Sequence, residues 1–364
     1  MHISPTISKY FALHYMFWLC SVFFVLLGIV ALFDFVELLR RASGKEGTDL
    51  AIVLQMSAFK LPLLMQHMLP FSVLFGAMFS FWRLARNREL VIARAAGVSA
   101  WQFLVPALCI SFFVGALQIG LFNPVTSIML SKFERLESRY LKNSTSMLAI
   151  STNGLWLRQA DAGGQTAIYA MRMSQSDVTL QQVIFFLFEG RDTFIGRIDA
   201  ESAKLEDGYW IISNAWISAP NKAARFVETY RQRTDLTLDK IQDSFASPET
   251  MSFWDLPAFI NTLKTAGFSA HRHRLYWHSL LSFPILLCAV VLIAAAFSIR
   301  ISKNWNTGFM IMSGIGAGFL LYFLTDVIYA LGLSANIPVL LAAWTPAGVS
   351  LALGITSLLH LEDG

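Results

Sequence analysis

The chain has 364 residues, of which 55% are hydrophobic and only 14% are charged. A soluble globular domain carries about 25% charged residues, so a single soluble globule is excluded. Most of the charges lie between residues 123 and 276. The sequence therefore indicates a membrane protein that also contains a soluble domain.

Six stretches without Asp, Glu, Lys or Arg are long enough to cross a bilayer, which takes a helix of about 18 to 20 residues. They cover residues 10–33, 61–82, 95–131, 275–299, 304–325 and 327–360. The sequence predicts six transmembrane helices. We interpret the first as a retained helix, because it is too long for a signal peptide and lacks a small-residue cleavage site before Asp34.

The basic loops predict the orientation. The loop between the second and third spans carries Arg83, Arg86, Arg88 and Arg94, and positively charged loops stay in the cytoplasm. An even number of spans then places both termini on the cytoplasmic side. We expect three spans within residues 1–122, an exported periplasmic domain with its connectors over residues 123–270, and three further spans within residues 271–364.

The exported segment alternates apolar and polar residues like a meander of strands, with turn signals such as Asp207-Gly208. Expected strands begin near residues 155, 167, 183, 198, 209, 225 and 235. This pattern favours a β-sandwich or jelly roll. Helical spacing over residues 252–266 predicts an amphipathic connector. The expected fold is a polytopic α-helical membrane protein with an inserted exported β-jelly-roll domain.

Motifs for covalent chemistry are missing from the sequence. No G-x-x-x-x-G-K-[ST], H-E-x-x-H or G-x-S-x-G pattern occurs. The cysteines each lie in a different apolar run, where a thiol behaves as a small hydrophobe. His271 and His273 lack a third ligand, so we interpret them as interfacial. The sequence predicts no catalytic residue, metal site or cofactor in this chain.

The cytoplasmic stretch 83–100 predicts a short helix under the membrane, with Leu84, Val91 and Ala95 on one face and Gly97 as its stop. The alternative is a basic connector that only obeys the topology rule. The string from Arg88 to Gly97 (RELVIARAAG), preceded by Pro62, Pro70 and Leu74-Phe75-Gly76, resembles the coupling-helix region of the YjgP/YjgQ permeases. These are the lipopolysaccharide export permeases LptF and LptG. The strand GLWLR at residues 154–158 is more similar to the LptG branch.

The resemblance implies a subunit of an ATP-binding-cassette exporter for lipopolysaccharide. The implied partners are an LptF-like paralogous permease, an LptB-like ATPase dimer that hydrolyses the ATP, and LptC/LptA-like periplasmic bridge proteins; no nucleic acid is implied. Arg88 and Glu89 would face the ATPase, and Leu90, Val91 and Ala95 would pack into its groove. The full set of implied coupling residues is Arg86, Arg88, Glu89, Leu90, Val91, Arg94, Ala95 and Gly97.

Ionisable residues also lie in or near the spans, where charges are costly and face a cavity or each other. They are Asp34, Glu37, Arg40, Arg41, Lys60, Lys132, Arg135 and, in the fifth span, Asp326. We expect the first seven to bind the phosphorylated head of a glycolipid, with Lys60 reaching up by snorkelling. The alternative is a set of interfacial anchors and internal ion pairs, for instance Glu37 with Arg41.

Aromatic residues of the spans, namely Phe71, Phe75, Phe319 and Tyr322, could line an acyl-chain cavity or simply face lipid. The spacing of Gly314 and Gly318 permits close helix contact, at a gate or a subunit seam. A different function is also open: a membrane-anchored envelope scaffold whose β-domain recruits periplasmic proteins. A scaffold would need neither charges in its spans nor a docking helix.

Overall fold

A computed structural model describes residues 5–362 except 44, 46–47, 96, 98, 142–154, 162–163, 175–178, 190–192, 207, 221, 235–246, 266–269, 302–306 and 335. The chain divides into two compact units. The helical unit comprises Met1–Leu136, Pro248–Leu256 and His271–Gly364, and the sheet unit comprises Glu137–Ser247 and Pro257–Ala270.

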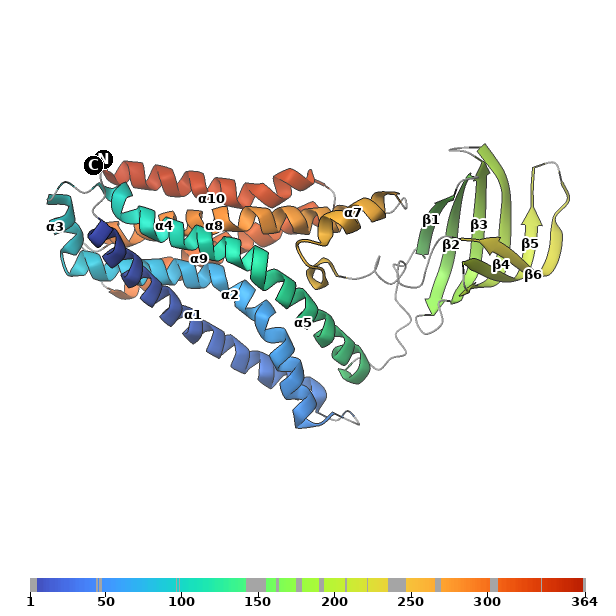
Figure 1. Ribbon diagram of the computed structural model, residues 1–364, viewed down its shortest axis with the longest axis horizontal. Helices are drawn as coiled ribbons and strands as arrows, with labels where there is room; N and C mark the ends of the chain where they lie inside the picture. The colour runs from blue at the N-terminus through green and yellow to red at the C-terminus, as the bar shows by residue number, and fades with distance from the viewer. Residues whose placement is uncertain are drawn as a thin grey trace. The chain divides into compact units, whose positions relative to one another are not determined.

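The helical unit contains six helices that are long and apolar enough to cross a membrane, which confirms the six expected spans. Figure 1 labels them α1 (Pro5–Ala42), α2 (Leu50–Arg86), α4 (Ala100–Leu117) with its extension α5 (Asn123–Leu136), α8 (His271–Ile301), α9 (Thr307–Leu333) and α10 (Val339–Glu362). A π-helical turn, Gln118–Phe122, joins α4 to α5, and the short helix α3 (Glu89–Ala95) lies between α2 and α4.

The π-helical turn has a physical cause in the sequence. Pro124 has no N–H, so it cannot donate to the carbonyl of Gly120 four residues earlier. The indole Nε1 of Trp254 donates to that carbonyl instead, at 3.1 Å. Asn123, which is fully buried, accepts a hydrogen bond from the backbone N–H of Phe253 at 2.7 Å. The residues that follow the short 3-10 helix Pro248–Thr250 are therefore fixed to the break in this helix.

Helix α8 forms the centre of the helical unit. It packs against α10, α2, α4 and α9, and its Leu287, Val291 and Ala294 are fully buried together with Val73 and Ala77 of α2. Helix α1 packs on α2 and α4. The hydroxyls of Tyr15 in α1 and Ser111 in α4 are hydrogen-bonded at 2.6 Å, which satisfies both groups inside the bundle.

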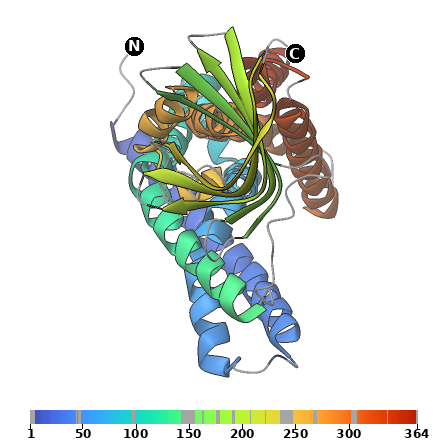
Figure 2. The ribbon, with the colours of Figure 1, turned by 90° about the vertical axis from the view of Figure 1, so that its right-hand side faces the viewer.

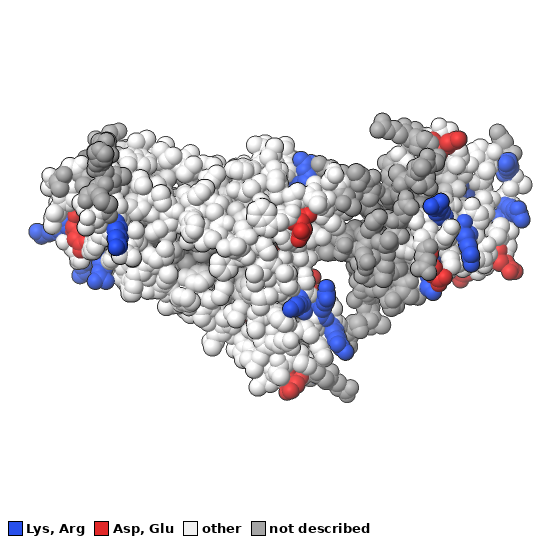
Figure 3. All heavy atoms as spheres, in the orientation of Figure 1, with Lys and Arg blue, Asp and Glu red and all other residues white. Residues whose placement is uncertain are grey.

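Both ends of the chain and α3 lie at one end of the helical unit (Figure 1). The chain leaves this unit after Leu136 and returns to it at Pro248, toward the opposite end. On the face shown in Figure 3, the Lys and Arg side chains of this unit gather toward its two ends and leave an uncharged band between them. Such a band is the surface that a bilayer requires.

The sheet unit contains six antiparallel strands in the order β1-β2-β3-β4-β5-β6. They are β1 (Leu155–Asp161), β2 (Gly164–Ser174), β3 (Thr179–Glu189), β4 (Thr193–Glu206), β5 (Tyr209–Ser218) and β6 (Arg225–Arg233). The sheet is strongly curved (Figure 2). Its core includes Ile168, Ile198 and the rings of Phe185 and Trp210, which lie 6.2 Å apart although β4 separates their strands.

The expected inserted β domain is confirmed, and its topology is simpler than the expected jelly roll. The described strands form one meander, with none of the crossovers of a Greek key. Alternation of side chains indicates strands but carries no information on their connection, which explains the difference. The strand expected near residue 235 lies outside the described residues. Helix α7 spans Leu256–Thr265 and so begins later than the expected connector.

Candidate functional site

The segment expected to form one cytoplasmic helix over residues 83–100 is divided in two. Helix α2 continues to Arg86, Asn87 caps its end, and Arg88 adopts a left-handed conformation with φ of 60°. Helix α3 then begins at Glu89. Asn is a common residue at such helix ends, so Asn87 was the sequence signal for this break. Gly97 has φ of 84°, consistent with its predicted role as a stop.

The side chains of α3 divide between the chain's own core and solvent. Leu90 is 5% exposed and belongs to the core that also includes Leu84 and Phe103, so the expectation that it packs into a partner is wrong. Val91 and Ile92 are 63% and 67% exposed. Ile92 was not predicted from the sequence. Helical spacing does not show which apolar face of a helix the rest of the chain already covers. The other exposed residues among those described in this segment are Arg83, Arg86, Asn87, Arg88, Arg94, Ala95 and Gly97.

Glu89 already has partners within the chain. Its carboxylate accepts hydrogen bonds from the Tyr10 hydroxyl at 2.9 Å and from Asn87 Nδ2 at 3.1 Å. The first of these bonds ties α3 to the beginning of α1. Glu89 therefore holds α3 against α1 of the same chain.

The ionisable residues at the other end of the helical unit form two separate pairs. Arg40 donates two hydrogen bonds to Glu37, both at 2.8 Å, so the partner of Glu37 is Arg40. Lys60 of α2 forms an ion pair with Asp34 of α1, and their side chains are 24% and 12% exposed. Lys60 therefore points inward to a carboxylate, whereas we expected it to reach up to the interface.

A second set of contacts joins α2 to α5. The Lys60 ammonium lies 5.5 Å from the centre of the Phe133 ring, and the Lys132 ammonium lies 5.6 Å from the centre of the Phe59 ring. Each helix thus places one Lys over an aromatic ring of the other, an attractive arrangement for a cation. Arg135 is exposed and Arg41 is partly buried. The seven expected residues lie at one end of the unit, and Glu37 also interacts electrostatically with Arg41 and Lys60.

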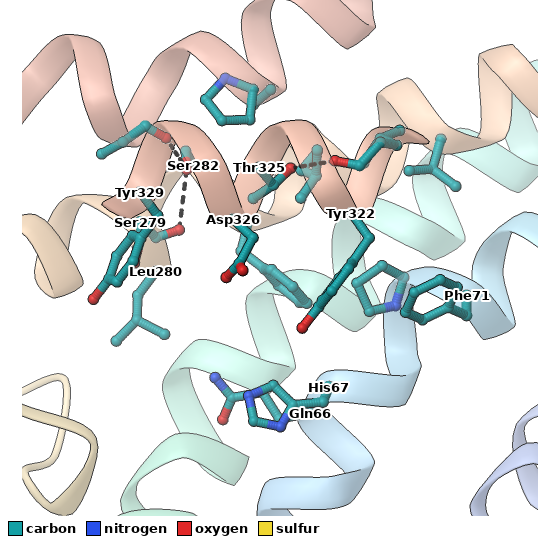
Figure 4. A pocket seen from close by; sticks show the side chains of 18 of the residues that line it. Gln66, His67, Phe71, Ser279, Leu280, Ser282, Tyr322, Thr325, Asp326 and Tyr329 are labelled. Atoms are coloured by element: carbon teal, nitrogen blue, oxygen red, sulfur yellow. Dashed lines mark hydrogen bonds between the residues drawn. The ribbon is translucent and has the colours of Figure 1, made fainter. Parts of the chain in front are cut away.

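A cavity of about 310 Å³ lies among α2, α8, α9 and α10. Phe71 and Tyr322 line it, as expected for two of the four aromatic residues. Phe75 packs against the bundle core, and Phe319 is 66% exposed and stacks on Phe323. The polar residues of the wall are Gln66, His67, Glu249, Tyr276, Ser279, Ser282, Tyr322, Thr325, Asp326 and Tyr329. Figure 4 labels all of these except Glu249 and Tyr276. Sequence reasoning identified Asp326 but missed Gln66 and His67, which were visible as polar residues inside an apolar run.

The cavity is connected to the segment that returns from the sheet unit. The hydroxyl of Tyr276 in the cavity wall accepts a hydrogen bond from Asn123 Nδ2 at 3.2 Å. Asn123 in turn holds the backbone of Phe253. A continuous set of hydrogen bonds therefore links the wall of the cavity, the π-helical break and the returning chain.

The pair Gly314 and Gly318 faces a helix of the same chain. A Cβ atom on Gly314 would lie 2.5 Å from Sδ of Met78, and one on Gly318 would lie 2.9 Å from Cδ2 of Leu74. Both partners belong to α2. The stripe thus permits close packing of α9 on α2 within the chain.

Comparison with known proteins matches residues 9–360 to the model of one family, described as lipopolysaccharide export system permease LptF/LptG. The chain is 23% identical over 351 residues to lipopolysaccharide export system permease protein LptG of Haemophilus influenzae, which covers 94% of this chain and 95% of the relative. It is 23% identical over 332 residues to the protein of the same name from Escherichia coli strain K12, with 89% of each covered. The matches include the helices on both sides of the inserted sheet.

Proposed function

Since this chain belongs to the lipopolysaccharide export permease family LptF/LptG, we propose that it forms half of the membrane channel of an ATP-binding-cassette exporter. The exporter extracts lipopolysaccharide from the inner membrane and passes it to periplasmic bridge proteins. The observation that carries this proposal is the family match along 9–360, on a chain with six membrane-length helices and an inserted sheet.

The end of the helical unit that holds α3 and both chain ends faces the cytoplasm in this proposal. Arg83, Arg86, Arg88 and Arg94 lie there, and short basic loops are retained on the cytoplasmic side. The chain leaves the helical unit for the sheet unit, and returns from it, at the opposite end, which supports a periplasmic β domain. There it receives lipid and hands it to LptC/LptA-like proteins.

ATP is hydrolysed by a separate LptB-like dimer, because this sequence contains no phosphate-binding loop. The dimer docks on α3. Two neighbouring apolar side chains, Val91 and Ile92, project from this short helix, and the exposed Arg88 and Arg94 flank them. An apolar centre with a charged rim is the usual composition of a protein interface.

The paralogous permease covers part of α1 and α9. Only 11% of the most apolar stretch of each helix is buried within this chain, against 61% for α8. Lipopolysaccharide phosphates are held by Arg40, Arg41, Lys132 and Arg135 at the outer ends of the spans. Bidentate contacts between Arg and phosphate favour such a role. Acyl chains lie against the exposed aromatic side chains of α9 outside the cavity, such as Phe319.

Co-purification tests this proposal against the scaffold alternative. We expect the chain to purify with an ATPase dimer, a second six-span permease and bound lipopolysaccharide. The isolated chain should hydrolyse no ATP, whereas the complex should. Val91→Glu places a charge in the docking face and should lower complex-dependent ATPase activity at least tenfold, since an unpaired interfacial charge costs about 2 to 5 kcal/mol.

Leu50→Glu is the matched control, because it adds the same charge to an exposed apolar residue at the opposite end of α2. It should leave the ATPase activity unchanged. Turnover by the isolated chain, or purification with periplasmic proteins but with neither an ATPase nor a second permease, would contradict the proposal and favour a scaffold.

A further inference from the structure

The cavity among α2, α8, α9 and α10 contains a carboxylate at membrane depth. Asp326 lies seven residues before the end of α9 at Leu333, which corresponds to about 10 Å along the helix. It is exposed to the cavity that it lines. Figure 4 shows Asp326 and Tyr322 of α9 pointing across this space toward Gln66 and His67 of α2. A carboxylate in a span is costly unless other groups satisfy it, so its position indicates a function.

Several side chains of the cavity wall offer hydrogen-bond acceptors. The hydroxyls of Ser279, Ser282 and Thr325 donate to backbone carbonyls at 2.7, 2.8 and 2.8 Å. Their protons are therefore used, and only oxygen lone pairs remain for a ligand. The Oε1 atom of Gln66 is buried and has no hydrogen-bond partner among the described residues. Together with the Asp326 carboxylate, these atoms are suited to a ligand that supplies hydrogen-bond donors.

The charges of the wall favour a neutral or donor-rich ligand over an anion. Among the described residues that line the cavity there is no Lys or Arg, whereas Asp326 and Glu249 both contribute carboxylates. A phosphate group here would lie near negative charge without a cation to pair with it. The described residues also include no group of three His, Cys, Asp or Glu side chains that could hold a metal ion.

We infer that this cavity binds the hydroxyl and N–H groups of the sugar head of the transported glycolipid. The inference rests on the proposed function and names a second site for the same substrate. Arg and Lys residues at the outer ends of the spans bind the phosphates. The acceptor atoms of the cavity wall bind the hydroxyl and N–H donors of the sugar. The volume of about 310 Å³ is near the lower limit of ligand pockets, so it accommodates part of a head group and not a whole lipid.

The site also explains how substrate and surrounding phospholipid are distinguished. Both have acyl chains and phosphate, but a phospholipid head carries few hydroxyl or amide donors. A site built to hydrogen-bond a polar group rejects an analogue that lacks it, because the buried acceptors of the site are then left unpaired. Asp326 and Gln66 are therefore specificity-determining residues.

The test uses two lipids without phosphate, so that the outer Arg and Lys residues have no phosphate to bind in either lipid. One is an N-acyl-glucosamine glycolipid and the other is a diacylglycerol with the same chain length. Equilibrium binding is measured on the assembled complex in nanodiscs. Asp326→Leu should weaken glycolipid binding about tenfold, the scale of a lost hydrogen bond to a charged group. It should change diacylglycerol binding by less than about twofold, because that lipid does not need the acceptor.

Tyr322→Phe removes one hydroxyl without changing the shape of the wall and keeps the test valid if Asp326→Leu does not assemble. It should also weaken only glycolipid binding. Thr356→Leu is the matched control, since Thr356 donates only to backbone carbonyls of its own helix. Equal weakening of both lipids, or glycolipid binding unchanged in both variants, would overturn the inference. Lipopolysaccharide-stimulated ATPase activity of the wild-type complex tests the proposed function separately.

Discussion

Helices α8 and α9 follow each other in the chain and are both apolar enough to span a membrane, yet their surroundings differ. In α8, 61% of the most apolar stretch is buried within the chain, and in α9 only 11% is. Helix α8 is rich in small and β-branched residues, such as Ala289, Val291 and Ala294, which are fully buried. Small residues allow close helix contact on several sides. Helix α9 also contains small residues, such as Gly314 and Gly318, but it packs on fewer helices than α8 does. Composition thus identifies a span, whereas its position in the bundle decides whether the chain itself surrounds it.

The largest expected effect comes from a cavity in α8. Leu287→Ala should lower the free energy of unfolding by about 2 to 5 kcal/mol, because a fully buried leucine loses its packing partners. The matched change in α9, Met312→Ala, affects a side chain that is 74% exposed and should have little effect. Denaturation midpoints in detergent measure both. Equal losses would show that α9 is as tightly packed as α8.

The inner face of α9 should be sensitive although most of the helix is not. Gly318→Val would place a Cβ atom 2.9 Å from Leu74, whereas nothing lies within 4 Å of a Cβ atom on Gly316. Overpacking typically costs about 1 to 3 kcal/mol, so Gly318→Val should destabilise the protein and Gly316→Val should not. The yield of disulfide bonds between cysteines introduced in α2 and α9 reports how closely the two helices approach. If the two variants behave alike, α9 does not pack on α2 through this stripe.

The ion pair of Asp34 and Lys60 should contribute less, since both side chains retain some exposure. A double-mutant cycle with Asp34→Asn and Lys60→Met should give a coupling energy of about 1 kcal/mol, within the range measured for contacting residues. The pair Glu37 and Arg40 is the control, because its side chains are 48% and 75% exposed and it should show no measurable coupling. A larger coupling energy in the control pair would mean that burial does not determine the strength of these ion pairs.

The outer cations should give the smallest single effects. Arg40→Glu or Arg135→Glu alone should change lipopolysaccharide crosslinking by less than about twofold, since exposed charges contribute little individually. The double variant should reduce crosslinking clearly, and more strongly at low salt than at high salt because ions screen exposed charges. Crosslinking yields at two ionic strengths measure this. Unchanged lipid capture by the double variant would leave these residues as interfacial anchors.

Much of the architecture could be predicted from local patterns. Uncharged runs identified the six spans, and alternation with turn residues identified the strands of the inserted domain. What could not be predicted depends on contacts between distant residues. Asp34 and Lys60 lie 26 positions apart, so neither run length nor spacing could pair them. Pairing changes the role of Lys60 from an interfacial cation to a partly buried partner.

The same limitation applies to the coupling segment and the cavity. The family resemblance placed Leu90 in the docking face, but only the fold shows that Leu84 and Phe103 belong to the core around it. The cavity brings together residues of α2, α8 and α9 that are far apart in the sequence. Polar residues inside an apolar run, such as Gln66 and His67, are the one local signal that could have indicated this site.

The most direct test of the proposed function is transfer of lipopolysaccharide by a reconstituted complex. Proteoliposomes with the full complex would be incubated with a periplasmic acceptor protein that carries a photo-crosslinking residue. We predict ATP-dependent accumulation of the lipopolysaccharide crosslink on the acceptor for the wild type and the Leu50→Glu control, and none above the level without ATP for Val91→Glu. Transfer that does not require ATP, or that Val91→Glu supports fully, would contradict the assignment of this chain as the membrane half of an ATP-driven exporter.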